Sequence, residues 1–162
     1  MKVAIITAST AVYKGEQEDA SGKVIRKMVE EAGLDVVFMK ALPTDKTVLS
    51  TVFQRMADGN LADLILTTGG TGFAPRDMTP EATNAVCDRM ANGIADAIRN
   101  YSMTITDRAM FSRAVSGLRK KTLIINLPGS PKAVTEALEY ILPKLPHGLD
   151  VLRGNVQECG RK

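Results

Sequence analysis

The sequence predicts an α/β fold, a three-layer α/β/α sandwich around a mostly parallel sheet in a single domain. The length of 162 residues fits one ordinary domain and is too short for two. Hydrophobic residues make up 44% of the chain, which allows a core to form without disulfides or metals. Apolar runs of strand length alternate with segments that repeat apolar residues every three to four positions, the pattern of alternating strands and amphipathic helices.

Four apolar runs are predicted to form the strands. They are nearly continuous, which is typical of parallel strands that are buried on both faces. We expect these strands at residues 3–7, 35–42, 61–68 and 123–127. Because parallel neighbours need crossover connections and such crossovers are right-handed, helices should cover both faces of the sheet.

Five segments with helical periodicity follow these runs. Ser21, Thr79 and Ser130 are the expected N-caps, and the last two precede a proline at the first helical position. The expected helices cover residues 21–32, 48–56, 79–90, 94–101 and 130–145.

The domain is expected to comprise residues 1–147, followed by a C-terminal tail at residues 148–162, because helical periodicity is lost from Gly148 onward. Within the domain, the pattern of residues 104–118 predicts no element. No apolar run approaches the roughly 18 residues that a membrane span needs, and the N-terminal run is too short for a secretory signal. We therefore expect a cytoplasmic protein with no membrane partner.

Composition argues against several classes of function. The 21 basic and 18 acidic residues leave a net charge of +3, and aromatic residues make up 4% with no tryptophan. A nucleic-acid-binding protein would need a basic face and stacking aromatics, so no nucleic acid partner is expected. Cys87 and Cys159 form no CxxC pattern, which favours two reduced thiols over a disulfide or zinc site. His147 is the only histidine, and we expect no catalytic role for it.

A glycine-rich segment, TTGGTGFAPRD at residues 67–77, follows the third strand. In parallel sheets ligands bind beyond the carboxyl ends of the strands, so this segment should lie at the ligand-binding edge. Glycines let backbone N–H groups approach a ligand, and together with threonine hydroxyls they form a nest for phosphate. The pattern is neither a dinucleotide fingerprint nor a P-loop. The alternative is a tight turn between strand and helix.

The fourth strand leads into a second glycine turn, LPGSPK at residues 127–132, just before a helix. Free N–H groups and the positive end of the helix dipole favour an anion at such a position. Lys132 opposes the dipole in the first turn, which indicates a ligand charge that balances it. The alternative is that Ser130 only caps the helix.

Two aspartates belong to loops at the same expected edge. Asp77 closes the glycine-rich segment and Asp45 follows the second strand, so their carboxylates could converge. Carboxylates beside phosphates suit Mg²⁺, which binds through one or two carboxylates plus substrate phosphates. The alternatives are an N-cap role for Asp45 and an ion pair between Asp77 and Arg76.

These motifs occur together in a known family. TTGGTG followed by FAPRD, TPEAT, the segment SRA at residues 112–114, and LIINLPGSPKAV closely resemble the MogA/MoaB-like family of molybdenum cofactor biosynthesis. The resemblance extends from residue 3 to about residue 145. It implies Mg²⁺-dependent adenylylation of molybdopterin by ATP, which yields adenylyl-molybdopterin and pyrophosphate.

The resemblance also implies which residues form the site. The catalytic, metal-linked acids of the family match Asp45 and Asp77, which would hold Mg²⁺. Its nucleotide- and pterin-binding positions match Thr68, Gly69, Gly70, Thr71, Gly72, Gly129, Ser130, Pro131 and Lys132. Many relatives carry Ser-Asp after the first strand, whereas this chain has Ala-Ser-Thr at residues 8–10, so an acid at that point has no counterpart here.

The resemblance further implies a homotrimer and a MoeA-like metal-insertion partner that uses the adenylate. Two other functions stay open at this point. A non-catalytic molybdopterin-binding scaffold of the MoaB type would hold the pterin without turning over ATP, and an unrelated nucleotide-binding regulator could have a similar sheet. The presence of both Asp45 and Asp77 favours the enzyme, because a pterin scaffold has less need of a metal site.

Overall fold

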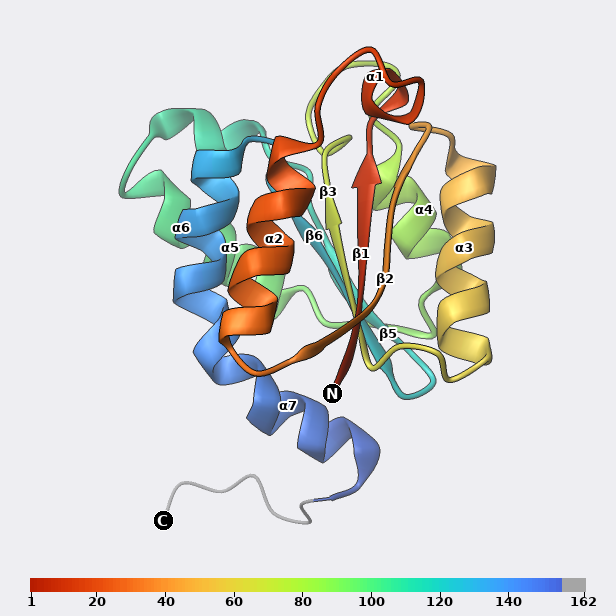
Figure 1. Cartoon of the computed structure of the whole chain (residues 1–162). Helices are drawn as coiled ribbons and strands as arrows, with labels where there is room; N and C mark the ends of the chain where they lie inside the picture. The colour runs from red at the N-terminus through yellow and green to blue at the C-terminus, as the bar shows by residue number, and fades with distance from the viewer. Residues whose placement is uncertain (156–162) are drawn as a thin grey trace.

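A six-stranded sheet with the order β2-β1-β3-β6-β5-β4 forms the middle layer of the computed structural model, which describes residues 1–155 (Figure 1). The strands are β1 (Lys2–Ala8), β2 (Asp35–Leu42), β3 (Leu64–Thr68), β4 (Arg89–Met90), β5 (Ser116–Arg119) and β6 (Thr122–Leu127). The neighbours β2, β1, β3 and β6 pair in parallel, whereas β5 and β4 add an antiparallel edge. The predicted mostly parallel sheet is therefore confirmed.

The four parallel strands end at one edge of the sheet, which we call the carboxyl edge. The register pairs Thr68 of β3 with Thr7 of β1 on one side and with Leu127 of β6 on the other. Ala8 pairs with Leu42, the last residue of β2. Because the ends are level, the loops that follow all four strands meet at this edge.

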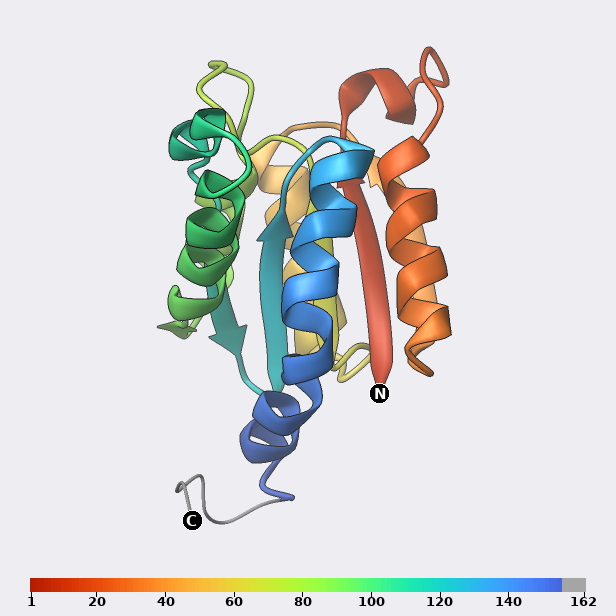
Figure 2. The ribbon, with the colours of Figure 1, turned by 90° about the vertical axis from the view of Figure 1, so that its left-hand side faces the viewer.

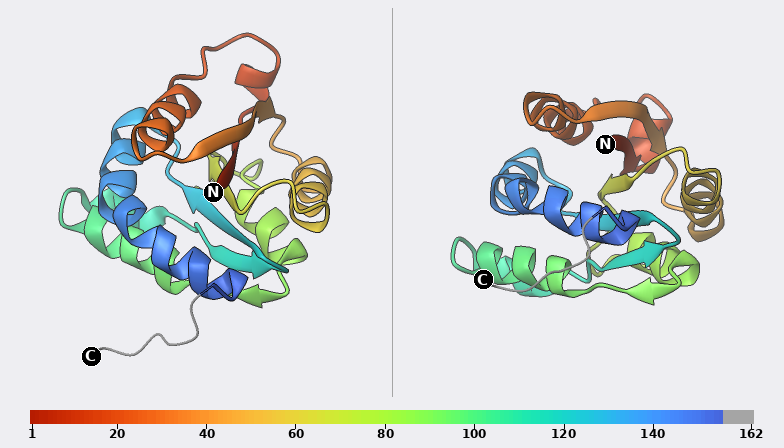
Figure 3. Two further views of the ribbon diagram at one scale, coloured as in Figure 1. Left: turned by 60° about the horizontal axis from the view of Figure 1, so that its bottom comes forward. Right: turned by 90° about the horizontal axis from the view of Figure 1, so that it is seen from below.

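Helices cover both faces of the sheet, so the predicted three-layer arrangement is also confirmed. The α-helices are α1 (Thr10–Tyr13), α2 (Ala20–Glu31), α3 (Lys46–Asp58), α4 (Thr79–Val86), α5 (Gly93–Met103), α6 (Pro131–Ile141) and α7 (Leu145–Arg153), with 3₁₀ turns η1 (Asp107–Phe111) and η2 (Leu142–Lys144). Helices α2, α5 and α6 lie against one face, and α3 and α4 lie against the other (Figures 1 and 2). The view from below shows the sheet between these two layers (Figure 3).

The alternation of side chains along β1 explains the two helix layers. Val3 and Ile5 belong to the core cluster under α2 and α6, while Ala4 and Ile6 belong to the cluster under α3 and α4. All four side chains are fully buried. Burial on both faces is the reason for the continuous apolar run in the sequence.

The helix expected at residues 79–90 ends earlier, at Val86, because the chain turns there to pair with β5. The N–H of Asp88 donates to the oxygen of Leu118 at 2.8 Å, and the N–H of Ala91 donates to the oxygen of Ser116 at 2.8 Å. These sheet-type bonds replace helical ones. Gly117 makes the pairing possible, since a Cβ there would lie 2.5 Å from the Cys87 sulfur.

The C-terminal helix was predicted as one segment, but it is broken at Leu142 and Pro143 into α6, η2 and α7. Proline lacks the N–H that a continuous helix needs. The expected loss of periodicity after residue 147 is wrong: α7 continues to Arg153, and Leu149 is fully buried in the core cluster. The division into a domain of residues 1–147 and a tail of residues 148–162 stays a prediction, and helix α7 crosses it.

Two further expectations concerned membrane-spanning segments and the state of the cysteines. No helix within residues 1–155 is long and apolar enough to cross a bilayer. Cys87 is a free thiol, and burial, followed by the charge of Asp88, raises its pKa to about 11, so it stays protonated at neutral pH. Cys159 lies outside the described residues.

Replacement of Leu149 tests whether the core extends beyond residue 147. We expect Leu149→Ala to lower the free energy of unfolding by about 2–5 kcal/mol, the usual cost of removing a buried leucine side chain. Val151→Ala is the matched control on the same helix, because Val151 is 38% exposed. It should change stability by less than about 0.5 kcal/mol. Equal urea midpoints for the two variants would contradict a core role for α7.

Candidate functional site

Three strand ends approach each other closely at Gly69, the first residue of the glycine loop (residues 69–78), which connects β3 to α4. Gly69 has a φ of +86°, and a Cβ there would lie 2.6 Å from the carbonyl oxygen of Ala8 at the end of β1. On the other side, a Cβ on Gly129 would lie 3.5 Å from the Cα of Gly69. Only glycine satisfies both the left-handed backbone and this spacing.

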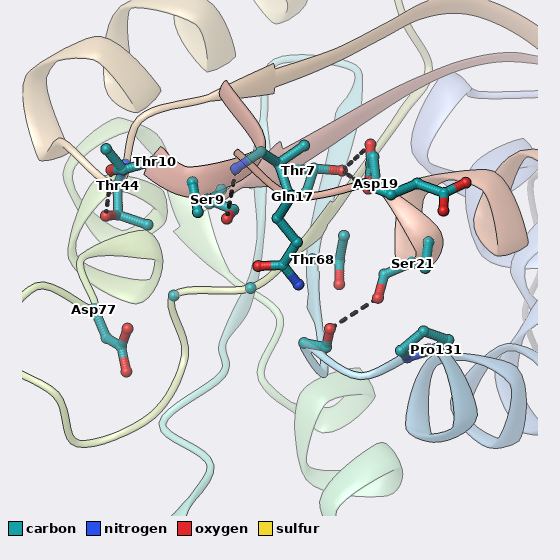
Figure 4. A pocket seen from close by; sticks show the side chains of 18 of the residues that line it. Thr7, Ser9, Thr10, Gln17, Asp19, Ser21, Thr44, Thr68, Asp77 and Pro131 are labelled. Carbon is teal, nitrogen blue, oxygen red and sulfur yellow. Dashed lines mark hydrogen bonds between the residues drawn. The ribbon is translucent and has the colours of Figure 1, made fainter. Parts of the chain in front are cut away.

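A cavity of about 360 Å³ opens at the carboxyl edge, around these strand ends (Figure 4). Six of the residues expected from the sequence line it: Thr68, Gly69, Gly70, Asp77, Gly129 and Pro131. The two glycine turns therefore belong to one cavity. The remaining expected residues, Asp45, Thr71, Gly72, Ser130 and Lys132, do not line it.

The N-terminal segment contributes a wall that the sequence reasoning missed. Thr7, Ser9, Thr10, Gln17, Asp19 and Ser21 all line the cavity. Figure 4 shows Asp19 and Asp77 on opposite sides of it, with the Gln17 side chain extending between them. The sequence pattern showed residues 9–20 only as a polar loop, so no side chain in it was assigned a role.

Asp19 is held firmly in this wall. Its carboxylate accepts a hydrogen bond from the Thr7 hydroxyl at 2.8 Å and from the N–H of Gly22 at 2.8 Å, which makes it the N-cap of α2 in place of the expected Ser21. A Cβ on Gly22 would lie 2.3 Å from an Asp19 oxygen. An aspartate followed three positions later by glycine was the signal that could have identified this cap.

Ser21 and Thr68 join the walls of the cavity to the turn after β6. The Ser21 hydroxyl donates to the carbonyl oxygen of Gly129 at 2.8 Å, and the Thr68 hydroxyl donates to that of Pro128 at 2.5 Å. The start of α2, the end of β3 and the turn before α6 are therefore fixed relative to one another.

Asp77 presents its carboxylate to the cavity from the glycine loop. Its Oδ2 accepts hydrogen bonds from the N–H groups of Gly72 at 3.1 Å and Ala74 at 3.3 Å. Among residues 1–155 no donor is hydrogen-bonded to Oδ1, and the ion pairs do not include one between Asp77 and Arg76. One carboxylate oxygen thus shapes the loop, and the other is available to a ligand.

Asp45 occupies the position of an N-cap. Its Oδ1 accepts the N–H of Val48 at 2.9 Å at the start of α3, and Asp45 does not line the cavity, although its neighbour Thr44 does. No group of three or more acidic, histidine or cysteine side chains that could hold a metal occurs in the part of the chain that is described. The pairing of Asp45 with Asp77 at a metal stays a prediction.

Ser130 caps α6, as one of the alternatives anticipated, with its hydroxyl accepting the N–H of Ala133 at 3.3 Å. Lys132 is exposed and does not line the cavity, which α6 reaches only through Pro131. His147 lies in α7, at the end of the molecule opposite the cavity (Figure 1).

A buried polar network supports the glycine loop from below. The Asn126 side chain donates to the hydroxyls of Thr67 at 3.1 Å and Thr83 at 2.8 Å. The Thr83 hydroxyl donates to the oxygen of Thr79, and the Thr79 hydroxyl donates to the oxygen of Gly69 at 2.9 Å. All four of these polar side chains are fully buried and satisfied, so the first residue of the loop rests on a rigid base.

Comparison with known proteins places this cavity in a family. The family model described as a probable molybdopterin binding domain matches residues 4–147. The chain belongs to this molybdopterin-binding-domain family. Every residue that lines the cavity lies within the matched range, so the family relationship covers the whole site.

Individual relatives resemble the chain over nearly its full length. A protein of Helicobacter pylori named molybdopterin adenylyltransferase is 37% identical, over 99% of this chain and 92% of the relative. The crystal structure of the molybdopterin biosynthesis enzyme MoaB from Thermus thermophilus is 42% identical with a TM-score of 0.88, covering 94% of this chain and 96% of that one. The Mog protein of Mycobacterium ulcerans is 36% identical with a TM-score of 0.87, covering 94% and 97%.

Glycine at position 69 is tested by a substitution that adds only a methyl group. Gly69→Ala should lower the free energy of unfolding by about 1–2 kcal/mol because of the left-handed backbone. Overpacking against the Ala8 oxygen should lower it by about 1–3 kcal/mol more. Gly15→Ala is the matched control, because Gly15 has a φ of +75° but no atom within 4 Å of the added Cβ. Denaturant unfolding of both variants measures the difference, and equal losses would show that the close approach to Ala8 is not a constraint.

Proposed function

We propose that this protein is a molybdopterin adenylyltransferase, which transfers AMP from ATP to molybdopterin in molybdenum cofactor biosynthesis. The observation that carries the proposal is the cavity at the carboxyl edge, where two glycine turns and Asp77 lie together in a chain 37% identical to a protein of that name. A phosphate oxygen of molybdopterin attacks the α-phosphorus of ATP. The bond from that phosphorus to the bridging oxygen breaks, and pyrophosphate leaves.

The chain contributes positioning and electrostatics to this reaction, and no side-chain nucleophile is needed. Gly69, Gly70 and Gly129 line the cavity without side chains, which leaves room for phosphates beside the backbone. Pro131 brings the first turn of α6 to the same cavity, where the positive end of the helix dipole favours an anion. Thr71, Gly72, Ser130 and Lys132 act around this rim in the proposal, Lys132 by attracting the anionic substrates.

A Mg²⁺ ion suits the donors that the cavity offers. The free Oδ1 of Asp77 is one hard oxygen ligand, and Mg²⁺ needs few protein ligands when it also binds substrate phosphates. In the proposal Asp77 holds the ion, and Asp45 assists through its second oxygen. When bound, Mg²⁺ neutralises charge on the triphosphate and on the departing pyrophosphate.

A molybdopterin-binding scaffold is the second candidate, because the matching family model is described as a probable molybdopterin binding domain, a description that names binding and no reaction. The decisive experiment incubates the protein with molybdopterin, ATP and Mg²⁺ and detects adenylyl-molybdopterin by mass spectrometry. Formation of the product with release of pyrophosphate supports the enzyme. Pterin binding without product supports the scaffold. Further parts of the proposal are a cytoplasmic location and use of the adenylate by a MoeA-like metal-insertion enzyme.

The carboxylate of Asp77 is the group on which the enzyme proposal depends most. Asp77→Asn keeps the shape but removes the charge, so we expect turnover to fall on the order of 100-fold or more, since metal stabilisation of the transition state contributes several kcal/mol. Molybdopterin affinity should change little, because the glycine turns hold the pterin. Asp35→Asn, an exposed aspartate at the start of β2, is the control. A folded Asp77→Asn variant with the parental rate would contradict the assignment.

An apolar surface beside the site supports the proposal of a homotrimer. Phe73 in the glycine loop is 68% exposed and packs edge-on against Phe111, which is 51% exposed, and Ile105 and Met110 are also exposed. Light scattering at micromolar concentration should give about three times the 17.4 kDa of one chain. Phe111→Glu should reduce that mass by placing charge in the apolar contact. A parent protein of 17 kDa in solution would contradict the trimer.

A further inference from the structure

Arg113 lies beside the glycine loop and donates to it at several points. Its Nε donates to the carbonyl oxygen of Gly72 at 2.7 Å, and its Nη2 donates to the carbonyl oxygen of Asp77 at 2.7 Å. Its backbone N–H donates to the oxygen of Thr71 at 2.9 Å. Its Nη1 pairs with a carboxylate oxygen of Glu81 in the first turn of α4. One guanidinium thus joins both ends of the loop segment 72–77 to the helix that follows it.

The contacts of Arg113 complement those of the Asp77 side chain. Oδ2 of Asp77 accepts the N–H of Gly72 from inside the loop, while Arg113 binds the carbonyl oxygen of the same residue from outside. Within the loop itself two other bonds help, from the N–H of Ala74 to Oδ2 of Asp77 at 3.3 Å and from the N–H of Asp77 to the oxygen of Ala74 at 2.8 Å. The segment has no regular secondary structure, and residues 73–76 are exposed. Its conformation therefore depends on these few bonds.

Arg113 is itself held in place by its surroundings. Arg99 of α5 donates to the carbonyl oxygen of Ser112 at 3.0 Å and to that of Ala114 at 2.6 Å, on both sides of Arg113. Burial raises the pKa of Glu81, but the hydrogen bond and charge of Arg113 outweigh it and keep that pKa below its ordinary value. The Glu81 carboxylate is therefore ionised at neutral pH and can pair with Arg113.

We infer that Arg113 is a positioning residue, which fixes the glycine loop so that the Asp77 carboxylate faces the cavity; its catalytic consequence rests on the proposed function. A guanidinium suits this task because its donors diverge in one plane and reach two carbonyls and a carboxylate together. Lysine has the same charge, but its three N–H donors share one nitrogen, which cannot take the places of the three separate nitrogens that Arg113 uses. The geometry of the donors, rather than the charge alone, determines the effect.

The test compares Arg113→Lys with Arg119→Lys. Arg119 is the matched control, because it also forms an ion pair, with Asp58 at 2.7 Å, and donates to a carbonyl oxygen, that of Val86, at 2.8 Å. Its side-chain hydrogen bonds, unlike those of Arg113, do not reach the glycine loop. Both variants should lose stability. Only Arg113→Lys should lower kcat/KM for ATP, by about 10- to 100-fold, the size of effect expected from misplacing a catalytic group by about 1 Å. It should also raise the Mg²⁺ concentration needed for half-maximal rate and leave the Kd of molybdopterin unchanged.

A second readout does not depend on any activity. In the protein without substrates, ¹⁵N relaxation should show that the backbone order parameters of Gly72, Ala74 and Asp77 fall from about 0.85 toward about 0.6 in Arg113→Lys but not in Arg119→Lys. If the parent protein makes no adenylyl-molybdopterin, the proposed function fails, and these order parameters still decide whether Arg113 fixes Asp77. If Arg113→Lys does not fold, Glu81→Gln serves instead, because it keeps the arginine but weakens its ion pair. In that variant the order parameters of the same three amides should fall by a smaller amount.

The outcomes separate cleanly. A rigid loop in Arg113→Lys, or a loss of activity equal to that of Arg119→Lys, overturns the inference and leaves Arg113 as a residue that serves stability alone. A mobile loop together with a raised Mg²⁺ requirement and unchanged pterin affinity supports it.

Discussion

The approach of Gly69 to the carbonyl oxygen of Ala8 sets the geometry of the carboxyl edge. β1 and β3 are hydrogen-bonded neighbours whose last residues are level, so the chain leaving β3 has to pass within contact distance of the end of β1. A left-handed glycine makes that turn without a side chain, and Gly70, also at positive φ, continues it beneath Thr79. A side chain at either position would push the loop away from the strand ends. The cavity exists because only backbone atoms occupy the place where the chain after β3 passes the end of β1.

The sequence predicts a strand or helix correctly where the pattern of apolar residues in that segment has a single explanation in the folded protein. Buried strands such as β1 and β6 were found because continuous apolar runs have one common explanation, parallel strands covered on both faces. Strands β4 and β5 were missed because they are short and depend on a distant contact, the fit of Gly117 over Cys87. Helix α7 was missed because Leu145, one of its two buried residues, was assigned to the end of the preceding helix, which left Leu149 without a second buried residue to show the helical repeat.

The roles predicted for the site residues stay predictions, but the sequence indicated the position of three glycines better than that of the carboxylates. Gly69, Gly70 and Gly129 line the cavity as expected because the end of a parallel strand determines where a glycine turn lies. An aspartate after a strand has two uses, and sequence does not distinguish them: Asp19 and Asp45 cap helices, whereas Asp77 braces a loop. Asp19 is held at the cavity by its hydrogen bond with Thr7, twelve positions earlier in the chain. No local sequence pattern indicates that contact.

A glycine-rich loop cannot hold a carboxylate steady by itself, because residues without side chains make few contacts and retain backbone freedom. Steadiness has to come from neighbours on other elements. The start of the glycine loop rests on the chain of bonds from Asn126 through Thr83 and Thr79, all of it buried in a region of low dielectric where satisfied hydrogen bonds are strong. Its end is held by Arg113, and only its tip, with Phe73, is exposed. The proposed adenylyl transfer would use this combination, since substrates would reach the cavity past an exposed tip while the Asp77 carboxylate keeps its position.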